Sequence, residues 1–191
     1  MDLKSALLHE GITLDDIFFD HIARYKAHLM QWNKVHNLTG AKSEAEVDYF
    51  IYDAVYPVSF LPPVATAMDI GTGAGFPGLI LAMALPQTHF TLVEPLKKRS
   101  GFLQYIKADL GLENVTVKSC RVEELPPATY DLVTSRAVTD TELLLKLSAP
   151  YTCEGSLLLF YKGEKVFDEV DASLKHRIIR TEKRHYLLIE K

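Results

Sequence analysis

The sequence predicts an α/β fold in which a mostly parallel, twisted sheet carries helices on both faces. Three observations support this fold. The first 60 residues carry a helical periodicity, whereas the chain from residue 67 onward alternates short apolar runs with helical segments. The last two apolar runs are separated by only a short polar link, which is typical of a hairpin. We therefore expect one doubly wound domain with a helical N-terminal extension.

The N-terminal extension, residues 1–62, contains two predicted helices. Apolar residues between Phe18 and Trp32 recur every three or four positions and so share one helical face. Asn37 and Gly40 follow as stop residues. A second helix is expected from about Ser43 to Phe60, ended by the prolines at 62 and 63. The residues of the first stripe are Phe18, Ile22, Tyr25, Leu29 and Trp32.

The remainder, residues 63–191, is predicted to be the α/β core. Short apolar runs separated by helical segments indicate strands that pair in parallel. The predicted strands are Ala67–Ile70, Phe90–Val93, Val115–Val117, Leu132–Thr134 and Leu157–Tyr161, followed by a hairpin of Arg177–Arg180 and His185–Ile189. The predicted helices are Pro77–Leu85, Leu96–Leu110 and Thr139–Ala149.

Composition narrows the class of protein. A chain of 191 residues can bury a core large enough to be stable without disulfides, and 48% of its residues are hydrophobic. Its two cysteines, Cys120 and Cys153, lack metal-like spacing, so we expect a reducing compartment and no metal site. The start of the chain lacks the apolar run of a signal peptide, and no stretch of 18 apolar residues occurs. We therefore expect a cytoplasmic protein, and since no surplus amphipathic stripe demands a partner, a monomer.

A glycine-rich turn, residues 67–78, joins the first predicted strand to the first core helix. Its glycines allow positive φ angles and a close approach of the backbone to a ligand. In an open parallel sheet, ligands bind beyond the carboxyl ends of the strands, where this turn is expected to lie. The alternative is a tight turn without a ligand, but three alternating glycines suit that poorly. The glycines at alternate positions are Gly71, Gly73 and Gly75.

The turn indicates an adenosine-containing ligand. Gly73, Gly75 and Gly78 satisfy G-x-G-x-x-G, the dinucleotide fingerprint. Glu94 ends the second strand, and a carboxylate there can accept hydrogen bonds from both hydroxyls of a ribose. Asp69, two residues before Gly71, completes a D-x-G-x-G-x-G arrangement that resembles motif I of Rossmann-like methyltransferases. That resemblance favours S-adenosylmethionine over a dinucleotide.

Further motifs together resemble the RsmG (GidB) family of 16S ribosomal RNA guanine-N7 methyltransferases. No single motif is decisive, but their order and spacing are highly specific, and the resemblance runs from about Trp32 to the C-terminus. It implies a Rossmann-like class I methyltransferase fold, S-adenosylmethionine as the cofactor and 16S rRNA or the 30S subunit as the partner. The motifs are Trp32–Thr39, Asp69–Gly78, Lys97–Arg99, Ser119–Glu124, Ser135–Ala137, Lys162-Gly163 and Arg184–Ile189.

The resemblance also implies cofactor contacts and shows one departure. Many members carry His-x-x-Asp-Ser before the first core strand, whereas this chain has Phe50 and Ala54 around Asp53, so roles of that His and Ser do not carry over. The contacts implied by the resemblance are Gly71, Phe76, Val122, Glu123 and Arg136. The glycine-rich turn and the end of the second strand add Asp69, Gly73, Gly75 and Glu94 to the predicted cofactor set.

The chemistry expected at this site needs no general base. The fourth strand ends in Ser135-Arg136-Ala137 and lacks the Asn/Asp-Pro-Pro-aromatic motif common in methylation of exocyclic amines. N7 of guanine has an in-plane lone pair and no proton to remove. Alignment of nucleophile and methyl group can contribute on the order of 7–11 kcal/mol, so we expect catalysis by positioning. Arg136 is the predicted positioning residue, on a methionine carboxylate, a phosphate or a guanine edge.

Basic residues are candidates for RNA phosphates. The net charge of −4 argues against indiscriminate coating of nucleic acid, yet a local basic face stays compatible with it. Lys97, Lys98 and Arg99 open a helix, where cations oppose the helix dipole, although a solvated helix start is an equal alternative. Lys162 and Arg184 complete the predicted set.

Two other functions remain compatible with parts of the pattern. The embedded G-x-G-x-x-G suggests an NAD(P)-dependent oxidoreductase, but a recognisable hydride-relay set is missing. A non-catalytic ligand-binding or RNA-chaperone module would keep the fold and lack transfer. The sequence does not show which guanine is methylated, or whether the substrate is naked rRNA or the assembled 30S subunit.

Overall fold

The structure, a computed structural model, describes residues 2–136, 138–164, 166–171, 173–181 and 184–191; Ala137 of the predicted Ser135–Ala137 motif lies outside this range. The helices are α1 (Leu3–His9), α2 (Asp16–His36), α3 (Glu44–Val55), α4 (Gly78–Ala84), α5 (Lys97–Leu110), α6 (Thr141–Ser148) and α7 (Val166–Glu169), with 3₁₀ turns η1 (Tyr56–Ser59), η2 (Val122–Glu124) and η3 (Ala149–Tyr151). The strands are β1 (Thr66–Ile70), β2 (His89–Val93), β3 (Val115–Lys118), β4 (Leu132–Arg136), β5 (Leu157–Lys162), β6 (His176–Arg180) and β7 (His185–Glu190).

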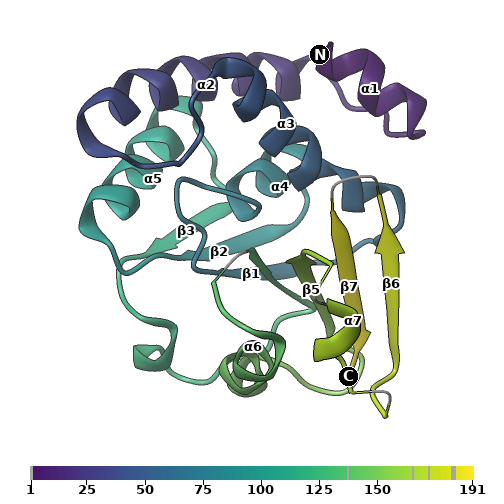
Figure 1. Cartoon of the computed structure of the whole chain (residues 1–191). Helices are drawn as coiled ribbons and strands as arrows, with labels where there is room; N and C mark the ends of the chain where they lie inside the picture. Colours follow the sequence, from purple (N-terminus) through teal and green to yellow (C-terminus); the bar gives the residue numbers. More distant parts are fainter. Residues whose placement is uncertain (1, 137, 165, 172, 182–183) are drawn as a thin grey trace.

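One seven-stranded sheet runs through the molecule in the order β3-β2-β1-β4-β5-β7-β6 (Figure 1). The strands β1 to β5 pair in parallel, and β7 pairs antiparallel with both β5 and β6. The chain order reverses between β1 and β4, which is the position where doubly wound sheets bind ligands. This sheet confirms the predicted parallel core and the C-terminal hairpin.

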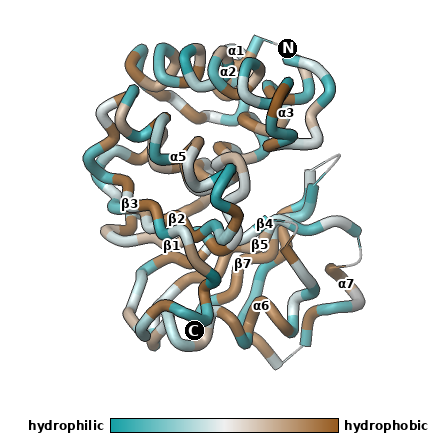
Figure 2. Tube along the Cα trace, turned by 90° about the vertical axis from the view of Figure 1, so that its left-hand side faces the viewer, coloured by the Kyte–Doolittle hydropathy of each residue, from teal (hydrophilic) through white to brown (hydrophobic). Residues whose placement is uncertain are grey.

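Helices cover both faces of the sheet. On one face α4 and α5 lie under α1, α2 and α3, while α6 and α7 lie on the other (Figure 1). Each face has its own core of buried apolar residues: Phe90 and Leu92 belong to the first, Met68 and Val133 to the second. In Figure 2 the hydrophobic residues gather along the sheet, and α2 alternates between hydrophobic and hydrophilic residues. The sheet strands are therefore buried on both sides, as continuous apolar runs predict.

The first helical stripe was predicted correctly. The helix α2 begins after Asp15, whose carboxylate accepts a hydrogen bond from the Phe18 amide at 2.8 Å. It ends at Asn37, which adopts the left-handed conformation with φ of 49°. Four of the five stripe residues are buried, and Trp32 is half-buried against the same core.

The second predicted helix is shorter than expected. It spans Glu44–Val55, with Ser43 as its N-cap, and the chain continues as the 3₁₀ turn Tyr56–Ser59. The prediction placed its end at Pro62 and Pro63, but Pro57 comes first. Since proline has no N–H to donate within an α-helix, Pro57 ends the regular hydrogen bonding five residues earlier than the paired prolines would.

The core elements lie within a few residues of their predicted bounds. The strand β4 extends to Arg136, two residues beyond the prediction, so Arg136 lies at the end of a sheet strand. Pro77 precedes α4 as its N-cap rather than occupying the first helical position. In the described part of the chain, no helix is long and apolar enough to cross a membrane.

Candidate functional site

A cavity of about 590 Å³ lies beyond the carboxyl ends of β1, β2 and β4. We call it the strand-end cavity. Its wall contains backbone from the glycine-rich turn, residues that follow β2, the end of β4, and side chains from the N-terminal extension. The predicted residues that line it are Gly71, Gly73, Phe76, Glu94, Arg99 and Arg136.

Two positions of the turn show why it needs glycine. Gly71 has a φ of +69°, and a Cβ built on it would lie 2.6 Å from Cγ2 of Val138. Gly78 has an ordinary φ, but a Cβ there would lie 2.5 Å from Cβ of Asp69 and 2.6 Å from Cδ2 of Leu92. The turn is thus packed closely against the sheet below it and against the segment after β4 beside it.

Asp69 lies beneath the turn and does not line the strand-end cavity. Its Oδ2 accepts a hydrogen bond from the Gly78 amide at 2.8 Å, and its Oδ1 accepts one from the Thr134 hydroxyl at 2.9 Å. The side chain is 0% exposed, and burial raises its pKa to about 6 against the hydrogen bonds that lower it. In the structure Asp69 fastens the start of α4 to β1 and β4, and its direct contact with the cofactor stays a prediction. Gly75 likewise points its Cβ position at Leu79 and does not line the cavity.

Glu94 lies on the cavity wall, as predicted, and also shapes the turn. Its Oε2 accepts a hydrogen bond from the Gly73 amide and its Oε1 one from the Leu96 amide, both at 2.9 Å. The residue is 3% exposed. Since an ionised carboxylate offers about four lone-pair positions, acceptor capacity remains for hydroxyl donors of a ligand. Glu94 therefore joins the end of β2 to the glycine-rich turn and can still accept from a ribose.

The helix α2 supports the turn from outside the cavity. Tyr25 is fully buried, and its hydroxyl donates to the Ala74 carbonyl at 2.8 Å. Its ring also meets the ring of Phe76 edge-on, with centroids 5.8 Å apart. The first helical stripe of the extension therefore does more than fill a core, because it fixes a carbonyl and an aromatic ring of the site.

Thr72 provides a test of whether the site fits a polar ligand. It lines the strand-end cavity, is 1% exposed, and its hydroxyl makes no hydrogen bond with the described residues. The hydroxyl is near enough to Asp69 to lower the pKa of that carboxyl, but its geometry is too poor for a hydrogen bond. Buried hydroxyls without partners are uncommon because they lose free energy relative to water. An unpaired hydroxyl on the cavity wall therefore suits a ligand with polar groups.

Arg136 reaches the same cavity from the end of β4. Its guanidinium lies 4.8 Å from the ring centroid of Phe50 and 4.8 Å from that of Phe76. Nη1 donates to Oδ2 of Asp53 at 3.3 Å, and the side chain is 13% exposed. Two aromatic rings and a carboxylate thus hold a cation against the cavity.

Besides Asp69 and Gly75, two more predicted cofactor residues are not on the cavity wall. Val122 begins the 3₁₀ turn η2 and is 5% exposed in the core on the α6 face, where its carbonyl accepts from the Tyr151 hydroxyl. Glu123 is exposed, and its carboxylate pairs with Arg121 at 2.9 Å. The structure therefore does not bring Val122 and Glu123 together with the glycine-rich turn, and their cofactor contacts stay predictions.

The basic candidates divide into two groups. Lys97 and Lys98 are exposed at the start of α5, and half-buried Arg99 lines the cavity. Lys162 instead pairs with Glu169 at 2.7 Å and is 10% exposed, while Nε of Arg184 pairs with Asp53 at 3.0 Å. Lys162 and Arg184 are therefore each paired with a neighbouring carboxylate in the structure, and their contact with RNA stays a prediction.

Sequence reasoning missed the roles of Asp53 and Phe50. Asp53 lies on α3 between the buried residues Ile51 and Ala54, so its carboxylate falls among apolar positions. A charged residue on a buried helical face must find a partner, and that conflict was the available signal. Among the described residues, no cluster of three or more His, Cys, Asp or Glu side chains is arranged to hold a metal ion.

Sequence comparison places this site in a known family. A family model described as rRNA small subunit methyltransferase G (GidB) matches residues 19–188. A protein named Ribosomal RNA small subunit methyltransferase G from Wolinella succinogenes is 49% identical over 185 residues, covering 97% of this chain and 96% of its own. A protein of the same name from Helicobacter hepaticus is 40% identical, covering 91% and 95%.

Solved structures support the fold alone. A putative caffeoyl-CoA O-methyltransferase from Staphylococcus aureus matches with a TM-score of 0.59 at 12% identity, covering 100% of this chain and 99% of its own. A ribosomal protein L11 methylase from Lactobacillus delbrueckii subsp. bulgaricus matches with a TM-score of 0.58 at 14% identity, covering 75% and 79%. At such low identities the shared feature is the Rossmann-like methyltransferase fold.

Proposed function

The chain belongs to the GidB family of small-subunit rRNA methyltransferases, and from this premise we propose that it methylates N7 of a guanine in 16S rRNA. It is an S-adenosylmethionine-dependent methyltransferase that modifies small-subunit ribosomal RNA. This membership excludes the oxidoreductase and the non-catalytic module that the glycine pattern left open. The acceptor atom and the roles of individual residues are the proposal.

One observation carries the assignment of the site: a buried acidic residue, an unpaired hydroxyl and a held cation meet in one cavity. Glu94, Thr72 and Arg136 all line the strand-end cavity. A carboxylate suits ribose hydroxyls, whereas a guanidinium suits a carboxylate or phosphate. S-adenosylmethionine has both a ribose and a carboxylate, so these three residues would hold it, with the amides of the glycine-rich turn.

The proposed mechanism relies on positioning. S-adenosylmethionine, when bound, supplies an electrophilic methyl group. Glu94 is the carboxylate on the described part of the cavity wall, and both of its oxygens already accept backbone N–H groups. The proposed acceptor, N7 of guanine, has no proton to lose, so the mechanism assigns Glu94 no role as a base. The chain's contribution is to bind both reactants, orient them through Arg136 and exclude water.

The acceptor is tested by incubating undermodified 30S subunits, and separately naked 16S rRNA, with radiolabelled cofactor. We expect label in 7-methylguanine, mapped by its labile glycosidic bond. Label at an exocyclic amine or a ring carbon would contradict the acceptor. If the rate of methyl transfer depends on pH through one enzyme group with a pKa near 7, while RNA binding is unchanged, the mechanism without a base is contradicted.

Two further parts of the proposal concern the state of the protein. Because its substrate is ribosomal RNA, we propose that it acts in the cytoplasm. We also propose that it acts as a monomer, since no surplus amphipathic stripe in the sequence demands a partner. Sedimentation of the purified chain at working concentration would contradict the second point if it gave a dimer.

A further inference from the structure

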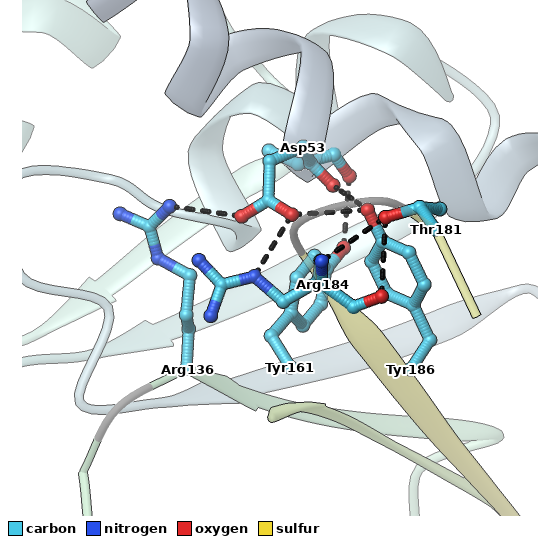
Figure 3. A network of polar contacts seen from close by, with 7 residues as sticks. Asp53, Arg136, Tyr161, Thr181, Arg184 and Tyr186 are labelled. Carbon is cyan, nitrogen blue, oxygen red and sulfur yellow. Dashed lines mark hydrogen bonds and ion pairs between the residues drawn. The ribbon is translucent and has the colours of Figure 1, made fainter. Parts of the chain in front are cut away.

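A single buried carboxylate links the strand-end cavity to the C-terminal hairpin. Asp53 is 1% exposed and comes from α3, whereas its partners come from β4, from β7 and from the residue just before β7 (Figure 3). Its two oxygens divide the contacts. Oδ2 accepts from Arg136 at 3.3 Å, and Oδ1 accepts from Arg184 Nε and the Tyr186 hydroxyl, both at 3.0 Å. In Figure 3 Arg136 lies to the left of the carboxylate, Arg184 beneath it and Tyr186 to its right.

The bond from Arg136 to Oδ2 of Asp53 matters because the other contacts of the guanidinium, two aromatic rings, do not fix its orientation. Phe50 and Phe76 contact its guanidinium at equal centroid distances of 4.8 Å, and rings do not fix rotation in the guanidinium plane. A hydrogen bond to one edge does fix it, because the five N–H donors form a rigid planar fork. Among the described residues, Asp53 supplies that bond. The position of Oδ2 of Asp53 then decides which way the other edge of the Arg136 guanidinium faces.

The charges in the network are unequal. Asp53 contributes one negative charge, and Arg136 and Arg184 contribute two positive charges. The network therefore keeps one unit of positive charge, and its member on the cavity wall is Arg136. Buried cations without a full counter-charge are costly, so an anionic group bound in the cavity would stabilise this arrangement.

We propose that Asp53 is a positioning residue for methyl transfer: it orients Arg136 so that the available edge of the guanidinium faces the reactants in the strand-end cavity. The proposal rests on the proposed function, since it assigns a role within that site. It differs from a purely structural role, in which Asp53 only ties α3 to the hairpin through Arg184 and Tyr186. A structural role predicts lost stability, whereas a positioning role predicts an effect that depends on Arg136.

A double-mutant cycle separates the two roles. Asp53→Asn, Arg136→Lys and the double variant are compared in single-turnover methyl transfer to undermodified 30S subunits at saturating cofactor. We expect Asp53→Asn to slow transfer about 10–100-fold in the parent chain, the range for a misplaced oriented group. In the Arg136→Lys background the same change should cost less than about 3-fold, because the fork that it orients is gone. Equal effects in both backgrounds, or an unchanged rate in the single variant, would overturn the proposal.

A matched control and a second variant keep the test decisive. Asp131 is hydrogen-bonded to Thr66 at the opposite end of β1, so Asp131→Asn makes the same chemical change without touching Arg136. We expect it to lower the melting temperature and leave the rate within about 3-fold. If Asp53→Asn does not fold, Asp53→Glu retains the charge but displaces the oxygens, and a parent-like rate in it would overturn positioning. Absence of transfer by the parent chain itself would instead contradict the proposed function.

Discussion

The two walls of the strand-end cavity are built in different ways. The wall formed by the glycine-rich turn is backbone, and each support binds an amide or carbonyl: Asp69 binds the Gly78 amide, Glu94 the Gly73 amide and Tyr25 the Ala74 carbonyl. The opposite wall is side chain, and its central group, Arg136, is held by Asp53 and two aromatic rings.

This difference indicates how each wall should respond to mutation. The backbone wall has several supports, each fixing a different amide or carbonyl, so its geometry should be lost mainly when the fold itself is disturbed. The side-chain wall depends on Arg136 at its centre, so truncation of that one side chain can remove the chemistry of the wall and leave the fold intact.

The largest expected effect on activity is at the side-chain wall. Arg136→Ala should lower single-turnover methyl transfer on the order of 10³-fold, the loss typical of removing a preorganised donor from an active site. The fold should survive, because Asp53 keeps Arg184 and Tyr186 as partners. Circular dichroism and thermal unfolding check the fold beside the rate. If the variant transfers methyl groups at the parent rate, Arg136 is not the positioning residue.

At the backbone wall the expected effect is on stability first. Gly78→Ala would place a Cβ 2.5 Å from Cβ of Asp69 and 2.6 Å from Cδ2 of Leu92, so one or both neighbours must shift. Overpacking of this kind costs about 3 kcal/mol of unfolding free energy. Urea denaturation measures it. The matched control is Gly101→Ala within α5, where a new Cβ meets nothing within 4 Å, so unchanged or increased stability is expected there.

The support beneath the backbone wall should also have a pH signature. Burial raises the pKa of Asp69 to about 6 from its ordinary value of 3.8, so the folded state holds this proton more tightly than the unfolded state does. Its contribution to stability is therefore present below about pH 4 and is lost as the pH rises to about 6, by about 3 kcal/mol in total. Asp69→Asn should remove this loss. Denaturation of both proteins from pH 4 to 7 measures the difference, and parallel curves would refute the raised pKa.

The same contrast explains what could be predicted from the sequence. The backbone wall is encoded within one short segment, so the glycines, Asp69 and the strand and helix that flank them were recognisable from local patterns. The side-chain wall depends on contacts between Asp53 and residues 83 and 131 positions away, which no local pattern records. The ion pairs of Lys162 and Arg184 illustrate the same limit: the charges of the two side chains are visible in the sequence, whereas the carboxylates that pair with them are not.

The smallest expected effect lies at the rim beside the backbone wall. Lys97 and Lys98 are exposed at the start of α5, where no acidic residue occupies the first turn and cations oppose the helix dipole. If they contact phosphates, the double charge reversal to Glu should weaken binding of RNA and reduce the slope of log K against log salt by about one unit for each lost contact. Filter binding across a salt series measures that slope.

A suitable control for this rim is Lys146→Glu on α6, which is equally exposed but lies on the other face of the sheet (Figure 1). It removes a surface pair with Glu142 and changes the net charge in the same direction, so it reports the general effect of charge on RNA affinity. We expect the salt slope of this control to match that of the parent chain. If it falls as much as that of the Lys97 and Lys98 variant, per charge changed, then net charge rather than contact explains the binding. The start of α5 would in that case be a solvated helix end beside the cavity.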